Sequence, residues 1–471
     1  MTERDAEPAV GRLAGLKLRL EPRLAELRSS DTAKAGGLAA AMIVTNVIAL
    51  GSTIVFARLL SDYSSLAALV SYFLILGVAG QAMQVATARE GVLGHLGVGH
   101  DLIVTLKRWA RTMLWVTLAL TALSVVFRAP IASAVGVKHY PWAAALGVPA
   151  ACVWLELSIL RGALQGVGDY RSVGVSLIGE QTTRLVTGAA LAAAGLSVTG
   201  AYLGTPLSLV AMCGFCVWMM YKLTLTDGPE SAGGEPVNAA APIDIDLWTH
   251  VKRAWAPIAG LIVIAVLQNI DIIAAKHRLA GIKHLADSYA ATAVAGKVLI
   301  WVAIGAGFYL VPEVSRRRSA GEDTRPVLVR ALGIILVCAI PVLLIFAFGA
   351  RPLLSLAFRH DQLLATNSLL ILGIAFTILA CTYLAIQYML AQHRIGFLIF
   401  VGPVAIAEPV LLLAAPRNPS GFAAVVLGIQ TVAAVVAFAL ALWRDKPPPK
   451  PAAPDGPHSD QLETLPLPVE V

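Results

Sequence analysis

The chain has 471 residues, of which 57% are hydrophobic and only 14% are charged, and its formal net charge is +7. Soluble globular proteins carry about 25% charged residues, so this composition excludes a soluble globular protein and a disordered chain. The mean hydropathy of +0.75 instead favours an all-α polytopic membrane protein. In such a protein a basic excess indicates cytoplasmic loops that face anionic lipid before it indicates a nucleic-acid partner.

The N-terminal segment, residues 1–36, is polar and basic. Its leucines recur at helical spacing with arginine and lysine between them: Leu13, Leu16, Leu20, Leu24 and Leu27. This pattern predicts a basic amphipathic cytoplasmic tail that lies on the inner membrane surface. A partly ordered tail is an equally good interpretation of the same residues. The first apolar run begins near Leu38, which is too late for a signal peptide.

After that tail, twelve hydrophobic segments are long enough to cross a bilayer. They cover roughly residues 38–60, 64–86, 108–127, 142–160, 173–194, 198–221, 254–275, 288–311, 327–348, 366–388, 396–415 and 420–443. A Gly- and Pro-containing stretch divides them six and six and is typical of a flexible linker. The sequence therefore predicts a six-helix lobe at residues 37–223, a cytoplasmic linker at 224–250, a second six-helix lobe at 251–444 and a Pro-rich cytoplasmic tail at 445–471.

The distribution of lysine and arginine predicts the orientation. With both termini in the cytoplasm, the inner loops and tails hold 25 basic residues, when Arg108, Arg111 and Arg330 at the inner ends of spans are included, and the outer loops hold 8. Cytoplasmic loops are enriched in lysine and arginine. We therefore expect a multi-pass protein of the inner (plasma) membrane with both termini cytoplasmic.

The two lobes resemble weak repeats of each other. Residues 57–63 and 277–289 each place an arginine-leucine pair at the end of a span, followed by an aspartate and a tyrosine. Repeated halves are typical of secondary transporters, which bind substrate between the repeats. Chance similarity between Leu- and Ala-rich helices is the alternative.

Charged residues inside spans are costly, at about 2.5–3.5 kcal/mol each on insertion scales. Glu180 and Arg184 are four residues apart, acid first, which favours an ion pair on one helix face. Asp271 has no basic residue four positions away, but Lys297 lies mid-span in the next helix. Either pair is explained by a purely structural ion pair. The functional interpretation assigns Arg184 and Lys297 to an anionic substrate, Glu180 to positioning Arg184, and Asp271 to a proton or cation.

Further polar residues lie near the ends of the spans. Arg58 is at the predicted outer end of the first helix, while Arg89 and Arg161 are near inner ends. They are candidates for contact with an anionic headgroup, or for snorkelling to lipid phosphates. Gln268 and Asn269 suit sugar hydroxyls or hydrogen bonds between helices.

Enzyme signatures are missing from the sequence. It contains neither a GxxxxGK[ST] phosphate loop nor an HExxH metal motif, and the predicted outer loops are too short for a sugar-processing domain. Cys213 and Cys216 form a CxxC inside an apolar segment, where buried thiols are the simpler interpretation. We therefore expect a non-enzyme with no catalytic residue, no metal site and no cofactor.

Three short motifs resemble one transporter superfamily. They are Leu-Arg-Gly-Ala-Leu-Gln-Gly-Val-Gly-Asp-Tyr at residues 160–170, Gln-Asn-Ile-Asp at 268–271, and Tyr-Ala-Ala at 289–291 leading to Leu-Val-Pro-Glu-Val-Ser at 310–315. They are similar to motifs of the multidrug/oligosaccharidyl-lipid/polysaccharide exporter superfamily, in particular its bacterial polysaccharide flippase branch. The resemblance implies a two-lobed bundle of twelve or fourteen helices, alternating access and a central cavity. It also implies outward movement of an undecaprenyl-pyrophosphate-linked sugar.

The sequence and the resemblance together predict a flippase for a lipid-linked oligosaccharide. The predicted partners are this substrate, membrane lipids and enzymes of polysaccharide synthesis, and no nucleic acid. The predicted substrate-binding residues are Arg184, Glu180, Lys297, Arg58, Arg89, Arg161, Gln268 and Asn269, with Asp271 as the ion-coupling residue. The rivals are a sodium- or proton-coupled multidrug exporter, a polytopic sugar polymerase or ligase, and a scaffold derived from a flippase.

Overall fold

The computed structural model describes residues 31–97, 99–226, 246–282 and 284–443, and within these ranges it contains helices and no strands. The long helices of the first half are α2 (Asp31–Leu59), α3 (Tyr63–Val92), α4 (His100–Val126), α7 (Gly147–Gly166), α8 (Tyr170–Leu191) and α9 (Ser197–Thr226). Those of the second half are α11 (Trp255–Arg278), α12 (Leu285–Gly296), α13 (Val298–Ser319), α14 (Arg325–Phe348), α16 (Leu369–Ala391), α17 (Phe397–Ala414) and α18 (Pro419–Leu442).

Among the described residues, eleven helices are long and apolar enough to cross a membrane. One of them, Tyr170–Leu223, is long enough for two crossings and comprises α8 and α9. Each of the twelve predicted segments therefore corresponds to a helix or a helix pair. The expectation of an all-α polytopic membrane protein is confirmed.

Short helices at the ends of the bundle were not predicted. They are α5 (Arg128–Val135), α6 (Pro141–Ala145), α10 (Leu247–Arg253), α15 (Ala350–Ala357) and the single turns η2 (His360–Gln362) and η3 (Thr366–Ser368). Their lengths are below what hydropathy over a membrane-spanning window detects. The residues of the two predicted tails up to residue 30 and from residue 444 lie outside the described part, as do residues 227–245 of the predicted linker.

The bend between α8 and α9 depends on backbone conformation at two residues. Gly195 has φ 98° within the π turn η1 (Ala192–Leu196), and Ser197 follows with φ 49°. The two helices then pack so closely that a Cβ on Gly204 would lie 2.8 Å from the Cα of Gly188. Only glycine permits this approach, so these two glycines fix the hairpin.

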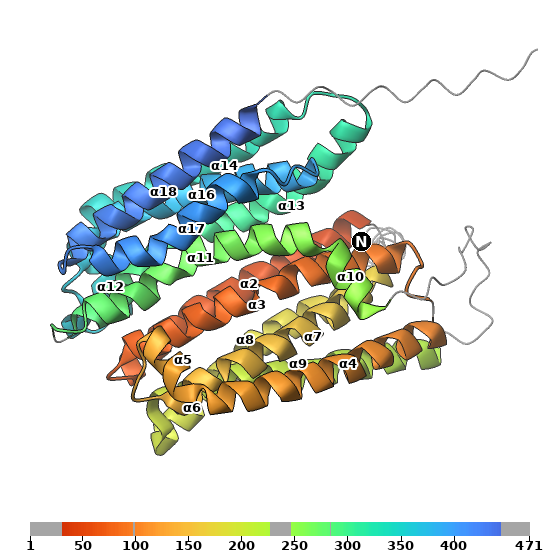
Figure 1. The fold of residues 1–471 in the computed structure, drawn as a ribbon, viewed down its shortest axis with the longest axis horizontal. Helices are drawn as coiled ribbons and strands as arrows, with labels where there is room; N and C mark the ends of the chain where they lie inside the picture. Colours follow the sequence, from red (N-terminus) through yellow and green to blue (C-terminus); the bar gives the residue numbers. More distant parts are fainter. Residues whose placement is uncertain (1–30, 98, 227–245, 283, 444–471) are drawn as a thin grey trace, which may run out of the picture.

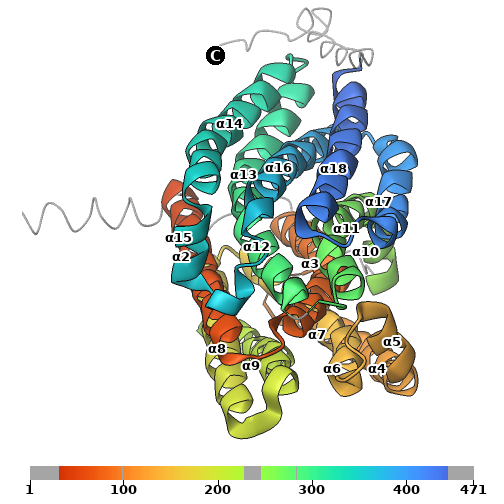
Figure 2. The ribbon, with the colours of Figure 1, turned by 90° about the vertical axis from the view of Figure 1, so that its left-hand side faces the viewer.

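The helices of the two halves form two groups, which lie in the lower and upper parts of Figure 1. Each group has its own buried core, and residues of α3 and α11 contribute to both cores. Helices α3 and α11 pack against each other and form the principal contact between the halves. Figure 2, viewed from the end that lies on the left in Figure 1, shows α2 beside α15 at the edge of the bundle.

The two ends of the bundle differ, and we name each by one of its features. The Asp62 end holds the α2–α3 turn, α5, α6, α15 and the start of α12, and lies on the left in Figure 1. The α10 end lies on the right and holds α10, the start of α4 and the end of α9. Chain direction alternates between these ends, as expected of helices that cross one bilayer in turn.

Candidate functional site

A buried cluster of three charges lies in the first half of the chain. Glu180 of α8 accepts a hydrogen bond from Arg184 Nη2 at 2.5 Å through Oε1, and one from Arg161 Nη2 of α7 at 3.0 Å through Oε2. One carboxylate thus serves two guanidinium groups. We call these residues the Arg161–Glu180–Arg184 cluster.

The two arginines of this cluster differ in their surroundings. The side chain of Arg161 is fully buried, donates to Ser176 Oγ and to the Ser176 carbonyl at 2.8 and 2.9 Å, and lies against the Trp154 ring. The side chain of Arg184 is 16% exposed and lies near Phe73. Arg161 is therefore enclosed by protein, whereas the side chain of Arg184 is partly exposed.

Unused hydrogen-bond donors remain inside the cluster. Arg161 Nη1 and Arg184 Nε are buried and have no partner. With two arginines and one glutamate, the cluster carries a net charge of +1. Buried donors without acceptors are costly. An anionic oxygen would supply both the missing hydrogen-bond acceptor and the missing negative charge.

Arg161 lies deeper than the sequence interpretation placed it. We expected it near the inner end of the fourth span, able to meet a headgroup, but its exposed fraction is 0%. The reason is the packing of α7 against α8, which brings Arg161 beside Ser176 and Glu180. Its side chain orients Glu180, and through Glu180 it orients Arg184.

A second buried charge cluster lies in the second half. Lys297 Nζ donates to Asp271 Oδ1 at 2.9 Å, and the Tyr289 hydroxyl donates to Asp271 Oδ2 at 3.4 Å. Lys297 is the residue between α12 and α13, and its ammonium lies over the Phe376 ring. The interhelical Asp271–Lys297 pair, one of the two interpretations of these residues, is thus present.

Glu408 of α17 extends this second cluster. It is fully buried and accepts a hydrogen bond at 3.2 Å from Nε2 of Gln430, which also donates to the Leu267 carbonyl. Glu408 Oε2 and Gln430 Oε1 are buried without a partner. Glu408 is close enough to Asp271 and Lys297 to interact with both electrostatically. Two acids therefore share one nearby ammonium.

Two of the predicted polar residues flank this cluster on α11. The Asn269 amide is buried and donates to the Ala265 carbonyl of its own helix at 3.0 Å. Gln268 is half-buried. The hydrogen bond of Asn269 makes it a local partner of the α11 backbone.

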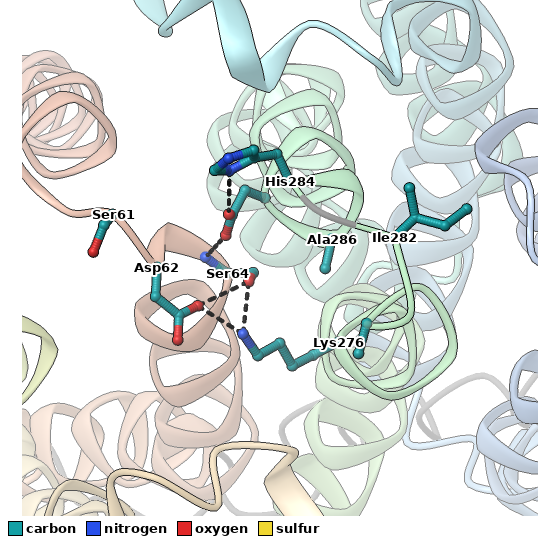
Figure 3. Close-up of a pocket in the computed structure, with 9 residues that line it drawn as sticks. Ser61, Asp62, Ser64, Lys276, Ile282, His284 and Ala286 are labelled. Atoms are coloured by element: carbon teal, nitrogen blue, oxygen red, sulfur yellow. Dashed lines mark hydrogen bonds and ion pairs between the residues drawn. The ribbon is translucent and has the colours of Figure 1, made fainter.

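At the Asp62 end, polar side chains join the two halves (Figure 3). Lys276 of α11 donates to Asp62 Oδ1 at 2.6 Å and to Ser64 Oγ at 2.9 Å. The Ser64 amide donates to Asp287 of α12 at 2.7 Å, and His284 lies 3.7 Å from the other oxygen of Asp287. These residues line a polar cavity of about 230 Å³. We call Asp62, Ser64, Lys276 and Asp287 the interhalf latch.

The charge state of Asp62 suits this role. Burial alone would raise the pKa of its carboxyl, but hydrogen bonds from Lys276 and Ser65 and the positive charge of Lys276 outweigh burial and lower that pKa. Asp62 is thus ionised throughout the neutral range. The same carboxylate is the N-cap of α3, because it accepts from the Ser65 amide and hydroxyl.

Other interhalf contacts lie at the same end. The exposed Arg58 of α2 donates to the carbonyls of Leu356 and Ala357, which end α15. Gln362 donates to the Ala57 carbonyl at 3.1 Å. Arg58 therefore caps the end of α15 and links the two halves. Neither the snorkelling nor the headgroup interpretation of Arg58 predicted this contact. Arg89, by contrast, is exposed at the last turn of α3 at the α10 end.

Sequence reasoning named Arg161, Glu180, Arg184, Asp271 and Lys297 but missed other members of these groups. It did not name Gln430 or pair Asp62 with Lys276, although the aspartate was noted in the repeat. A glutamine inside an apolar span was the available signal for Gln430. Within the ranges described, no three His, Cys, Asp or Glu residues are close enough to hold a metal ion.

No family model matches the sequence, and no curated protein matches it. Solved structures do resemble the fold. The lipid II flippase MurJ in its inward closed conformation aligns with TM-score 0.64 and 14% identity over 86% of this chain and 87% of that chain. The eukaryotic MATE transporter AtDTX14 aligns with TM-score 0.57 and 14% identity over 88% and 96%.

One further similar structure is described as a member of the MOP superfamily. An outward-facing multidrug resistance MATE family transporter of the MOP superfamily aligns with TM-score 0.52 and 14% identity over 88% of this chain and 96% of that one. At this identity the likeness concerns the fold. The chain has the fold of the multidrug/oligosaccharidyl-lipid/polysaccharide exporter (MOP) superfamily, as its short motifs predicted.

Proposed function

We propose that the chain is a plasma-membrane transporter that moves a lipid-linked pyrophosphate oligosaccharide outward by alternating access. The observation that carries the proposal is the Arg161–Glu180–Arg184 cluster, with its net positive charge and two buried donors without acceptors. Arginine suits a phosphate because its planar fork of donors matches the phosphate oxygens. Arg184, the more exposed of the two arginines, contacts the pyrophosphate, and Arg161 positions it through Glu180.

The orientation of the cycle rests on the distribution of basic residues. An excess of 25 over 8 supports cytoplasmic termini and an outward-facing Asp62 end. In this orientation the interhalf latch closes the outer side. Release of the substrate then requires Lys276 to separate from Asp62, and Ser64 from Asp287, as the halves rock.

Asp271 is the proposed ion-coupling residue. It is paired with Lys297 here, and Glu408 lies nearby with one oxygen unpartnered. Movement of Lys297 away from Asp271 would leave two acids in need of a proton or a cation. Lys297 lies at the break between α12 and α13, so a change of backbone conformation there would move the ammonium.

The comparisons are also compatible with one alternative, a sodium- or proton-coupled multidrug exporter, because MATE transporters share the fold. The two functions need opposite charges at the binding site. A cationic drug requires net acid, whereas a pyrophosphate requires net base. The positive cluster in the first half therefore favours the flippase, while the acidic cluster around Lys297 is assigned to ion coupling. The proposed partners are lipid and polysaccharide-synthesis enzymes, and the chain has no proposed catalytic role of its own.

The test uses the full chain in liposomes with a fluorescent pyrophosphate-linked oligosaccharide lipid, whose exposure is read with a membrane-impermeant quencher. We expect wild type to flip this lipid, Arg184→Ala to lose flipping, and Arg171→Ala to keep it. Arg171 is the matched control because it is an exposed arginine on the same helix. Efflux of a lipophilic cation without lipid flipping would support the exporter instead.

A further inference from the structure

Helix α10 is docked onto the first half of the chain although it continues into α11 of the second half. Leu247 and Ala254 are buried in the core of the first half. His250 is 1% exposed, stacks on the Trp109 ring of α4 at 5.0 Å between ring centroids, and lies 3.1 Å from Thr87 Oγ1 of α3. Burial lowers the pKa of His250, so this docked ring is neutral at pH 7.

The opposite face of α10 is exposed and combines aromatic rings with cations. Trp248 is 62% exposed, and Trp255, just after the helix, is 52% exposed. Lys252 and Arg253 are exposed on the same short helix, and Lys252 Nζ lies 5.4 Å from the centre of the Trp248 ring. A cation held over an indole in this way is a recognised favourable arrangement.

The same combination recurs on the helices next to α10. Lys222 Nζ lies 5.7 Å from the centre of the exposed Trp218 ring on α9. Lys107 of α4 lies 5.3 Å from the centre of the exposed Tyr221 ring of α9. The stacking of His250 on Trp109 joins α10 to α4, and the Lys107–Tyr221 contact joins α4 to α9, so the three pairs lie on adjacent helices at the α10 end.

We propose that this surface, made of Lys107, Trp218, Tyr221, Lys222, Trp248 and Lys252, binds the headgroups of anionic phospholipids. The aromatic rings lie where apolar helices end, the level at which indole and phenol rings enter the bilayer interface. The three ammonium groups then lie at the level of the lipid phosphates. Basic clusters at this level attract anionic lipid specifically, because zwitterionic lipid carries no net charge.

The surface belongs to one half of the molecule. In the second half, the basic residues at the same end include Arg318 and Arg330, and neither is held over an aromatic ring in the described structure. Bound anionic lipid would thus anchor the first half and its docked α10. This proposal is independent of the transported substrate, since it concerns the outer surface of the helices.

The experiment measures binding of dioleoylphosphatidylglycerol and dioleoylphosphatidylcholine to the full chain by native mass spectrometry in detergent. The test variant is Lys222→Gln/Lys252→Gln, and the matched control is Arg318→Gln/Arg330→Gln, which removes the same charge from the same end. We expect the test variant to lose affinity for phosphatidylglycerol on the order of tenfold. Phosphatidylcholine binding and the control variant should remain at the wild-type level.

Equal phosphatidylglycerol binding by wild type and test variant would overturn the proposal. Equal losses in the test and control variants would also overturn it, because they would indicate bulk charge rather than a defined surface. Trp248→Leu is a second test variant, which leaves every charge in place. It tests whether the surface binds anionic lipid if the double variant does not fold. It should weaken phosphatidylglycerol binding roughly threefold, and unchanged binding would contradict the part assigned to the ring.

Discussion

At the scale of single residues, one carboxylate holds the first-half cluster together. Glu180 is the counter-charge of both Arg161 and Arg184, and all three are wholly or largely buried. Removing one member of a buried ionic group leaves an uncompensated charge. This lowers stability more than replacing the whole group with apolar residues would. The three residues therefore respond differently to substitution, and this difference separates a structural role from a binding role.

Glu180→Gln should be the most destabilising change in the cluster. It leaves two guanidinium groups without a counter-charge, and we expect a loss of about 3–5 kcal/mol of stability, measured as unfolding in detergent. Glu156→Gln is the control, because Glu156 is a half-buried acid on neighbouring α7 that forms no ion pair with a described residue. Equal stability of the two variants would refute the assignment of Glu180 as the shared counter-charge.

The Asp271–Lys297 pair is tested by a double variant. Asp271→Asn removes the carboxylate that is hydrogen-bonded to the Lys297 ammonium. Lys297→Met leaves the buried Asp271 carboxylate without its hydrogen-bonded counter-charge, so each single variant should lose stability. Asp271→Asn/Lys297→Met removes both charges and should fold and bind lipid-linked substrate, but transport should no longer depend on pH or sodium. Unchanged ion dependence in this double variant would show that the pair is structural.

The Asp62 pKa predicts how the latch responds to pH. Lys276 and Ser65 lower the pKa of Asp62 in the folded protein. The stability that ionised Asp62 contributes is therefore fully present above the ordinary carboxyl range and is lost only as the pH falls through the lowered pKa. In a variant with its native cysteines replaced, Ser61→Cys is labelled with an impermeant maleimide, and its rate is divided at each pH by that of a fully exposed reference cysteine to remove the titration of the thiol itself. This relative rate should be flat between pH 5 and 8. Adding Asp62→Asn should raise that rate at every pH; a rate that rises from pH 8 to pH 5 without it would contradict the assignment.

At the scale of helices, the spans were predictable and their ends were not. Hydropathy is a local property, so each long helix corresponded to an apolar run in the sequence. The Glu180–Arg184 pair was predictable for the same reason, since its members are one helical turn apart. The Asp62–Lys276 contact joins residues 214 positions apart, and Arg161 reaches Glu180 only because α7 packs on α8. Such contacts depend on how the helices pack in three dimensions, and packing cannot be read from the residue pattern of a single sequence.

The α8–α9 hairpin gives a prediction at this scale. A Cβ at Gly204 would lie 2.6 Å from the Arg184 carbonyl oxygen, so Gly204→Ala forces the helices apart and displaces Arg184. We expect a loss of about 1–3 kcal/mol, read as a lower melting temperature, together with slower transport. Gly214→Ala on the same helix is the control, because no atom lies within 4 Å of its added Cβ. A Gly204→Ala variant as stable as this control would exclude the close approach.

At the scale of the whole molecule, orientation is the property that remains to be measured. The basic asymmetry predicts that the linker and the C-terminal tail are cytoplasmic. Reporter fusions at residues 240 and 460 should therefore be active in the cytoplasmic assay and silent in the periplasmic one. Periplasmic activity at either position would reverse the assignment of the Asp62 end to the outside, and with it the direction of the proposed transport.

Asp62 both pairs with Lys276 and caps the start of α3, and this combination affects how the two halves separate. When Lys276 leaves, the carboxylate still accepts from the Ser65 amide and hydroxyl, because those bonds belong to the start of α3 itself. Separation of the halves therefore leaves Asp62 with hydrogen-bond donors, and the departing Lys276 ammonium enters water. Because neither charge of the Asp62–Lys276 pair is left buried and unpaired, this contact adds less to the free energy of separating the halves than a fully buried ion pair would.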